Sequence, residues 1–218
     1  MAKARAKAKP GAKAGKDRRQ EILAAAAQVI TDRGLAETRI QDIAETCGVS
    51  TGLILYYFES KDRLLVEALT FANDKYYLAQ SRELRRLSSA RGQLERLIEL
   101  SVPGLLGEYE RLEEWALWLE IWVRALRDPS LAREREALDR RWRQSISDIV
   151  RHGRETGEFP DGNDADELGM EIGALIDGLA VQVLLNDTVL TPERMKAVCI
   201  DVATRLIGSP LEPASASR

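Results

Sequence analysis

Residues 39–58 read RIQDIAETCGVSTGLILYYF and predict two short helices joined by a tight turn. The first helix is expected to end at Cys47, because the next residue, Gly48, can adopt a positive φ without steric cost. Ser50 is suited to the N-cap of the second helix, since its hydroxyl can accept a hydrogen bond from a backbone N–H in the first turn. The second helix is then expected to run over residues 51–57.

A capping box is expected at the start of the first helix. The Thr38 hydroxyl can accept a hydrogen bond from the backbone N–H near Gln41, and the Gln41 side chain can reach back. Ala44 is small where the second helix must come close. The positions that face inward if the two helices cross steeply are Ile43, Cys47, Val49, Ile54 and Tyr57.

This arrangement is the one that a helix-turn-helix requires. Such a unit places the start of its second helix in the major groove of DNA, where backbone N–H groups and the helix dipole meet phosphates. The alternative is an ordinary helical hairpin in an all-α core. The small residue, the glycine turn and the flanking basic residues favour the DNA-binding interpretation.

Charge is distributed unevenly along the chain. The 218 residues have a formal net charge of −3, yet residues 1–16 carry six Lys or Arg and no acidic residue. This low-complexity segment cannot bury a core, so we expect a disordered basic arm. Two interpretations stay open, because the arm either follows the DNA backbone in a salt-dependent way or is a solvated tail.

Composition argues against several classes of protein. The two cysteines, Cys47 and Cys199, have no metal-ligand spacing, so we interpret both as buried small hydrophobes in a reducing cytoplasm. The longest apolar stretch, residues 173–185, is broken by Asp177 and Gln182. No apolar segment follows the N-terminus either, so neither secretion nor a membrane span is expected.

An enzyme is the alternative from a different class, acting on small cationic or apolar substrates in a helical domain. Its only histidine would be His152, and the chain has no Gly-x-Ser-x-Gly, no Walker loop and no His-Glu-x-x-His. We therefore predict no catalytic residue, no metal site and no cofactor.

Three tryptophans mark a helix in the second half of the chain. Trp115, Trp118 and Trp122 are spaced i, i+3 and i+7, which places them on one face of a helix. The simplest interpretation is that they fill a core. The functional interpretation is an aromatic-walled effector pocket that holds a cation by cation–π contacts, with Glu114 and Asp177 as counter-charges.

The predicted helix that begins near residue 165 is apolar on two faces, and the last predicted helix, which begins near residue 191, adds further apolar residues. A helix apolar on two faces must be covered on both, so we expect a homodimer in which these helices form a four-helix bundle with their mates. Gly169, Gly173 and Gly178 would permit close helix approach. The predicted interface residues are Leu168, Ile172, Leu175, Leu179, Met195, Val198, Val202 and Leu206.

The N-terminal motifs resemble those of TetR-family transcriptional regulators over about a quarter of the chain. In that family the remainder is a divergent helical domain that dimerises and binds a small effector. The Trp-rich helix with the RDPSL sequence at 127–131, and the GEFP turn at 157–160, look like the BetI-like branch, whose named member senses choline. The N-terminal match runs from Arg18 to about Leu69 with Gly34, Thr38, Ile43-Ala44, Gly48-Val49-Ser50, Gly52, Tyr57-Phe58 and Lys61.

The resemblance implies which residues meet DNA. Tyr57 stands where many relatives have His, and residues 50–58 contain no Arg, Asn or Gln for bidentate base contacts. Specificity is therefore expected to rest on few direct contacts and on DNA shape. The candidate DNA contacts are Thr38, Arg39, Thr51, Gly52, Leu53, Leu55, Tyr56, Tyr57 and Lys61.

The predicted chain is all-α, with about nine helices and two folded domains. A three-helix DNA-binding domain is expected over 17–64, an effector-binding and dimerisation domain over 65–207, and a disordered tail over 208–218. The predicted function is a ligand-responsive, sequence-specific regulator that acts as a cytoplasmic homodimer and leaves double-stranded operator DNA when a small effector binds. An architectural DNA-binding protein without effector is the alternative, and a ligand-sized cavity would count against it.

Overall fold

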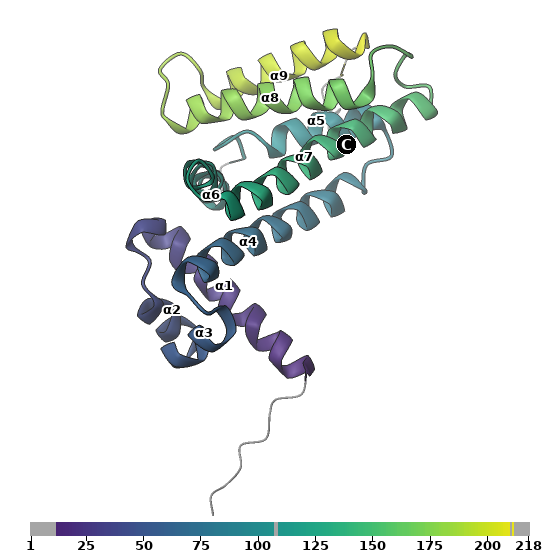
Figure 1. Cartoon of the computed structure of the whole chain (residues 1–218). Coiled ribbons are helices and arrows are strands. Elements are labelled where there is room, and N and C mark those ends of the chain that lie inside the picture. The colour runs from purple at the N-terminus through teal and green to yellow at the C-terminus, as the bar shows by residue number, and fades with distance from the viewer. Residues whose placement is uncertain (1–11, 107–108, 210, 212–218) are drawn as a thin grey trace, which may run out of the picture. The chain divides into compact units, whose positions relative to one another are not determined.

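The computed structural model describes residues 12–106, 109–209 and 211, and within them the chain forms α-helices and no strand (Figure 1). The all-α prediction is confirmed. The helices are α1 (Ala12–Glu37), α2 (Ile40–Cys47), α3 (Thr51–Phe58), α4 (Lys61–Leu84), α5 (Ala90–Leu100), α6 (Tyr109–Ala125), α7 (Pro129–Glu155), α8 (Ala165–Leu184) and α9 (Pro192–Ile207).

The chain divides into two compact units, and the long helix α4 runs through the division. Unit 1 ends at Ala72 and unit 2 begins at Asn73. The predicted boundary between residues 64 and 65 lies earlier in the same helix. The first turns of α4 belong to unit 1 because their apolar side chains are fully buried there, namely Leu64, Leu65, Ala68 and Leu69.

Unit 1 buries one face of α1 against α2, α3 and the start of α4. Helix α1 begins at Ala12, so residues 12–16 are helical and not disordered as predicted, because alanine and lysine are strong helix formers. Gly34, at φ 77°, interrupts its regular part. Residues 1–11 of the predicted basic arm lie outside the described residues. The fully buried side chains of this unit include Ile22, Ala26, Ile43, Ile54 and Phe58.

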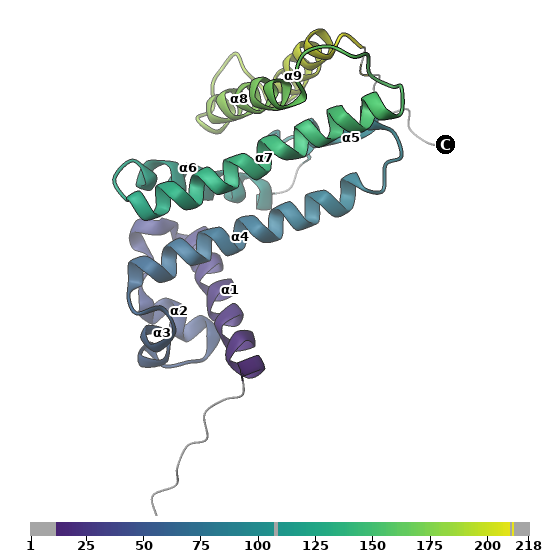
Figure 2. The same ribbon diagram turned by 45° about the vertical axis from the view of Figure 1, so that its right-hand side comes forward.

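Unit 2 packs α7 against α8, and Figures 1 and 2 both show α7 between α8 and the later part of α4. Two glycines allow this packing: a Cβ at Gly169 would clash with the Ser147 hydroxyl oxygen, and Gly173 lies against Trp142. Cys199 is buried here as predicted, and burial raises its pKa to about 12.

The start of the C-terminal tail contradicts the prediction of disorder over 208–218. Leu211 is buried, and its backbone N–H donates a hydrogen bond to the Thr204 hydroxyl oxygen at 3.3 Å. Ser209 is also buried and donates to the Glu158 carbonyl oxygen at 3.4 Å. Residues 210 and 212–218 lie outside the described residues. Among the described helices, none combines the length and the apolar character needed to cross a membrane.

Candidate functional site

The turn between α2 and α3 has the geometry that the sequence predicts. Gly48 adopts φ 65° and ψ 36°, and the Val49 N–H donates to the Ala44 carbonyl oxygen at 3.0 Å. The Ser50 hydroxyl accepts a hydrogen bond from the Leu53 N–H at 3.2 Å and so caps α3. The predictions of a glycine turn and a serine cap are both confirmed.

The start of α2 differs from the prediction. Thr38 is fully buried and its hydroxyl donates to the Gly34 carbonyl oxygen at 2.8 Å, so Thr38 neither caps α2 nor presents its side chain at the surface. Arg39 occupies the N-cap, and its N–H donates to the Asp42 carboxylate at 3.2 Å, the role predicted for Gln41. The cause is Gly34, which ends the regular part of α1 and leaves its carbonyl available to Thr38.

Helix α3 is buried on one side and open on the other. Ile54 and Phe58 are fully buried, whereas Tyr56 is 78% exposed. Tyr57 was predicted to face inward but is only half-buried, with its ring centroid 5.5 Å from that of Tyr56. Contact with DNA itself stays a prediction. Of the other candidates, the exposed ones are Arg39, Thr51, Gly52 and Leu55, and the half-buried ones are Leu53 and Lys61.

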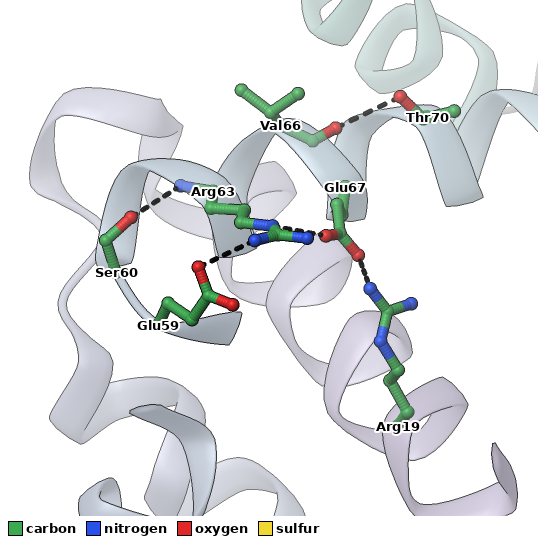
Figure 3. Close-up of polar contacts among 7 residues, drawn as sticks. All are labelled: Arg19, Glu59, Ser60, Arg63, Val66, Glu67 and Thr70. Carbon is green, nitrogen blue, oxygen red and sulfur yellow. Dashed lines mark hydrogen bonds and ion pairs between the residues drawn. The ribbon is translucent and has the colours of Figure 1, made fainter. Parts of the chain in front are cut away.

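A network of charged side chains ties the end of α3 to α1 and α4 (Figure 3). Arg63 on α4 pairs with Glu59, which follows α3, at 2.7 Å and with Glu67 at 3.2 Å. Glu67 also pairs with Arg19 of α1, whose guanidinium carbon lies 4.8 Å from the ring centroid of Phe58. Sequence reasoning missed this network, although the spacing of four residues between successive members of its Glu-Arg-Glu series is a signal.

Unit 2 contains a pocket with about 510 Å³ of empty space, part of it open to solvent. Five helices supply its walls, because α4, α6, α7 and α8 each point side chains into it and α5 ends at it. The walls are mostly aromatic. The lining residues are Tyr76, Tyr77, Leu100, Ser101, Trp115, Trp118, Trp122, Asp139, Trp142 and Asp177.

The structure brings together four of the five predicted effector residues. Trp115, Trp118, Trp122 and Asp177 all line the pocket, whereas the side chain of Glu114 lies outside the described residues. The ring centroid of Trp118 lies 6.4 Å from those of Trp122 and of Tyr77, in edge-to-face arrangements. The three tryptophans are therefore wall residues and only half-buried, although binding of an effector by them stays a prediction.

Two carboxylates, those of Asp139 and Asp177, line this aromatic pocket. Burial, followed by the charge of Asp139, raises the pKa of Asp177 to about 7, and Arg143 opposes the shift. Burial also raises the pKa of Asp139, although Arg135 donates a hydrogen bond to its carboxylate. A cation bound here would favour the ionised form of both groups.

Sequence reasoning missed six residues of the pocket, among them Leu100 and Ser101 at the end of α5. Asp139 lies in the densely charged helix α7, and Trp142 is one of the buried residues of the same helix. Their i, i+3 spacing places both on one face of α7, which is a signal that the charge pattern concealed. Tyr76 and Tyr77 lie in the middle of the long helix α4, where nothing in the local pattern distinguishes a pocket residue from a core residue.

The predicted dimer face of α8 and α9 is partly wrong. Leu168 and Ile172 are fully buried within the chain, because α8 packs this side against α7, and Met195 of α9 is fully buried as well. The opposite side of α8 is the one left open, and it carries Met170, Ala174, Gly178 and Gln182. Gly178 has no neighbour within 4 Å of a built Cβ. The remaining predicted interface residues are half-buried, namely Leu175, Leu179, Val198, Val202 and Leu206.

Comparison with protein families gives two matches, one in each unit. Residues 22–68 match the family model of bacterial regulatory proteins of the TetR family. Residues 90–208 match the model of the C-terminal region of BetI-type transcriptional repressors, which covers more than half of the chain.

Curated and solved relatives agree with these matches. The regulator BetI of Escherichia coli O127:H6 is 30% identical over 170 residues, which are 78% of this chain and 83% of that protein. A chain from Saccharomonospora viridis, solved in complex with choline, is 36% identical with a TM-score of 0.71 and covers 85% of this chain and 95% of its own. A TetR-family chain from Rhodococcus sp. is 26% identical, with a TM-score of 0.74 and coverage of 88% and 99%.

Proposed function

The chain belongs to the TetR family of transcriptional regulators, and from that premise we propose that it is a repressor released from its operator by a small quaternary ammonium cation. The observation that carries the proposal is the pocket of unit 2, where aromatic rings surround two carboxylates. Both the rings and the carboxylates attract a cation, because the ring faces and the carboxylate groups carry negative charge. An architectural DNA-binding protein would have no use for such a pocket.

Helix α3 is the proposed reading helix. Its exposed N-terminal residue, Thr51, lies where backbone N–H groups and the helix dipole favour phosphate or a base edge. Leu55 supplies an apolar contact and Tyr56 reaches phosphate. Thr38 is left out because it is buried. The proposed contacts are Arg39, Thr51, Gly52, Leu53, Leu55, Tyr56, Tyr57 and Lys61.

Choline is the first effector to test. The relative from Saccharomonospora viridis was solved with choline, and its 36% identity extends over 85% of this chain. Ammonium ligands of this kind are held in proteins by aromatic cages, and Trp118 and Tyr77 already stand at right angles to each other in the pocket. Asp177 is the proposed counter-charge.

Titration of intrinsic Trp fluorescence tests the ligand class. Choline and its uncharged isostere 3,3-dimethylbutan-1-ol have nearly the same shape, so only the charge differs. We expect saturable quenching by choline and none by the alcohol at the same concentrations. Quenching by the alcohol alone, or by neither compound, would mean that the tryptophans have a structural role and do not bind a cation.

We also propose a homodimer, with the open side of α8 against a second copy. The side that carries Met170 and Ala174 is apolar and exposed although α8 is a helix of a folded core. The variant Ala174→Arg should give a monomer in light scattering coupled to size exclusion. The matched variant Gln144→Arg, on the exposed surface of α7, should leave the mass unchanged, and an unchanged mass in Ala174→Arg as well would refute the interface.

Effector action follows from this dimer. Two reading helices fit an operator only at one separation, so an effector that favours another separation releases the DNA. It can shift the balance by no more than the difference between its affinities for the two states.

A further inference from the structure

Two tryptophans that line the pocket have an indole N–H without a hydrogen-bond partner. The Nε1 atoms of Trp122 and Trp142 are buried, and no described residue accepts a hydrogen bond from either. Buried N–H groups are rarely left without an acceptor in folded proteins. Because both rings line the pocket, the acceptor can come from a molecule bound in it.

Trp142 is the more constrained of the two donors. Its side chain is only 8% exposed, and its Nε1 lies 3.3 Å from the position of a Cβ built on Gly173 of α8. Gly173 lies one turn before Asp177 on the same side of α8. The donor of Trp142 is therefore held against the part of α8 that presents the pocket carboxylate.

We propose that Trp142 is a specificity-determining residue, whose Nε1–H donates a hydrogen bond to a neutral oxygen that the effector carries beside its cationic group. A hydroxyl or carbonyl oxygen suits this place better than a carboxylate, because Asp139 and Asp177 already bring negative charge to the pocket. The inference rests on the proposed function, since it names the class of ligand for the same site. That class is an oxygen-bearing ammonium ion rather than a bare one.

Calorimetric titration with choline and with tetramethylammonium separates the two classes. Tetramethylammonium has the cationic group but no oxygen, and Trp142→Phe keeps an aromatic ring but removes the N–H. We expect Trp142→Phe to weaken choline binding by about fivefold to tenfold and to change tetramethylammonium binding by less than about twofold. An equal loss for both probes, or no loss for choline, would overturn the inference.

Trp115→Phe is the matched control, because it makes the same substitution in a wall supplied by α6. It should weaken both probes alike, since it removes ring surface that faces the cation. Circular dichroism will show whether Trp142→Phe folds. If it does not, Gly173→Ala keeps the ring and places a methyl group about 3.3 Å from its Nε1. Choline should then lose more affinity than tetramethylammonium, and equal losses would again overturn the inference.

The same titrations keep this inference apart from the proposed function. If the unmodified protein binds neither cation, the proposal of a cationic effector is wrong, and the role inferred for Trp142 is wrong as well. If both cations bind equally well, and Trp142→Phe changes the two affinities equally, the pocket binds cations but Trp142 does not donate a hydrogen bond to an oxygen of the ligand.

Discussion

Unit 1 presents Tyr56 with 78% of its surface exposed, whereas unit 2 holds Trp142 at 8%. The proposed DNA contacts come mostly from one short helix and its flanks, and they need only to be exposed. The proposed ligand contacts come from five helices and form part of the core. A regulator of this kind therefore changes its DNA contacts at little cost in stability, but changes in its pocket affect folding and binding together.

Stability should show the largest difference between the two units. Trp142→Ala removes a buried ring from the core of unit 2 and is expected to lower the free energy of unfolding by about 3–5 kcal/mol. Tyr56→Ala should change it by less than about 0.5 kcal/mol, because the side chain is exposed. Urea denaturation measures both. Comparable losses of unfolding free energy in the two variants would contradict the expected difference between the two units.

The direct contacts with the operator should come from unit 1 alone. The double variant Thr51→Ala with Tyr56→Ala is expected to weaken operator binding by roughly 100-fold, because it removes two of the few direct contacts of α3. Fluorescence anisotropy on an operator selected from random DNA measures the affinity. Choline binding and the dimer should be unaffected in the same sample. Unchanged operator affinity would refute the assignment of the reading helix.

Effector affinity should depend on unit 2 alone. Trp118→Leu removes an aromatic wall and is expected to weaken choline binding by up to about thirtyfold. Operator affinity without effector should stay within about twofold of the parent. Calorimetry and anisotropy on the same preparation check the two halves of this prediction. A large loss of operator affinity would mean that Trp118 acts through folding instead.

The smallest expected effect is a pH dependence that only unit 2 should show. Asp177 has a pKa of about 7 and faces Asp139 and Arg143, so it gains its negative charge as pH rises through 7. Choline affinity should therefore increase between pH 6 and pH 8, by at most about tenfold. Asp177→Asn should make the affinity independent of pH over this range, and a similar slope in both proteins would exclude Asp177 as the cause.

The same ionisation affects folding with a known sign. The pKa of Asp177 is raised in the folded chain above its value of about 4 in an unfolded chain. The stability that this group contributes is therefore fully present below pH 4 and is lost as pH rises towards 7. Asp177→Asn should remove this loss, which urea denaturation at pH 5 and pH 7 can measure.

Unit 1 was largely predictable because its signals are local. Gly48 and Ser50 fix the turn through their own backbone and side chain, and both were found from the sequence. Thr38 was misassigned because its partner is the carbonyl of Gly34, whose conformation makes that contact possible. The pairing of Arg19 with Glu67 was missed because these residues come together only when α1 packs against α4.

Unit 2 was predictable only where one helix carries the pattern. The tryptophans of α6 share a face, and that face does line the pocket. Asp139 and Trp142 were hidden within a densely charged helix. The two apolar sides of α8 could not be told apart either, because Leu168 faces inward and Met170 outward only once α7 is in place. Residues that line one pocket from different helices have no shared pattern in the sequence.

Release of DNA by choline tests the central claim most directly, since it requires both units to act in one protein. A labelled operator selected from random DNA is bound to saturation and then titrated with choline or with 3,3-dimethylbutan-1-ol, with Trp118→Leu as the matched variant. The account predicts that anisotropy falls with choline alone, and that Trp118→Leu needs up to about thirtyfold more choline. Release by the uncharged alcohol at the same concentrations, or no release by choline while it occupies the pocket, would contradict it.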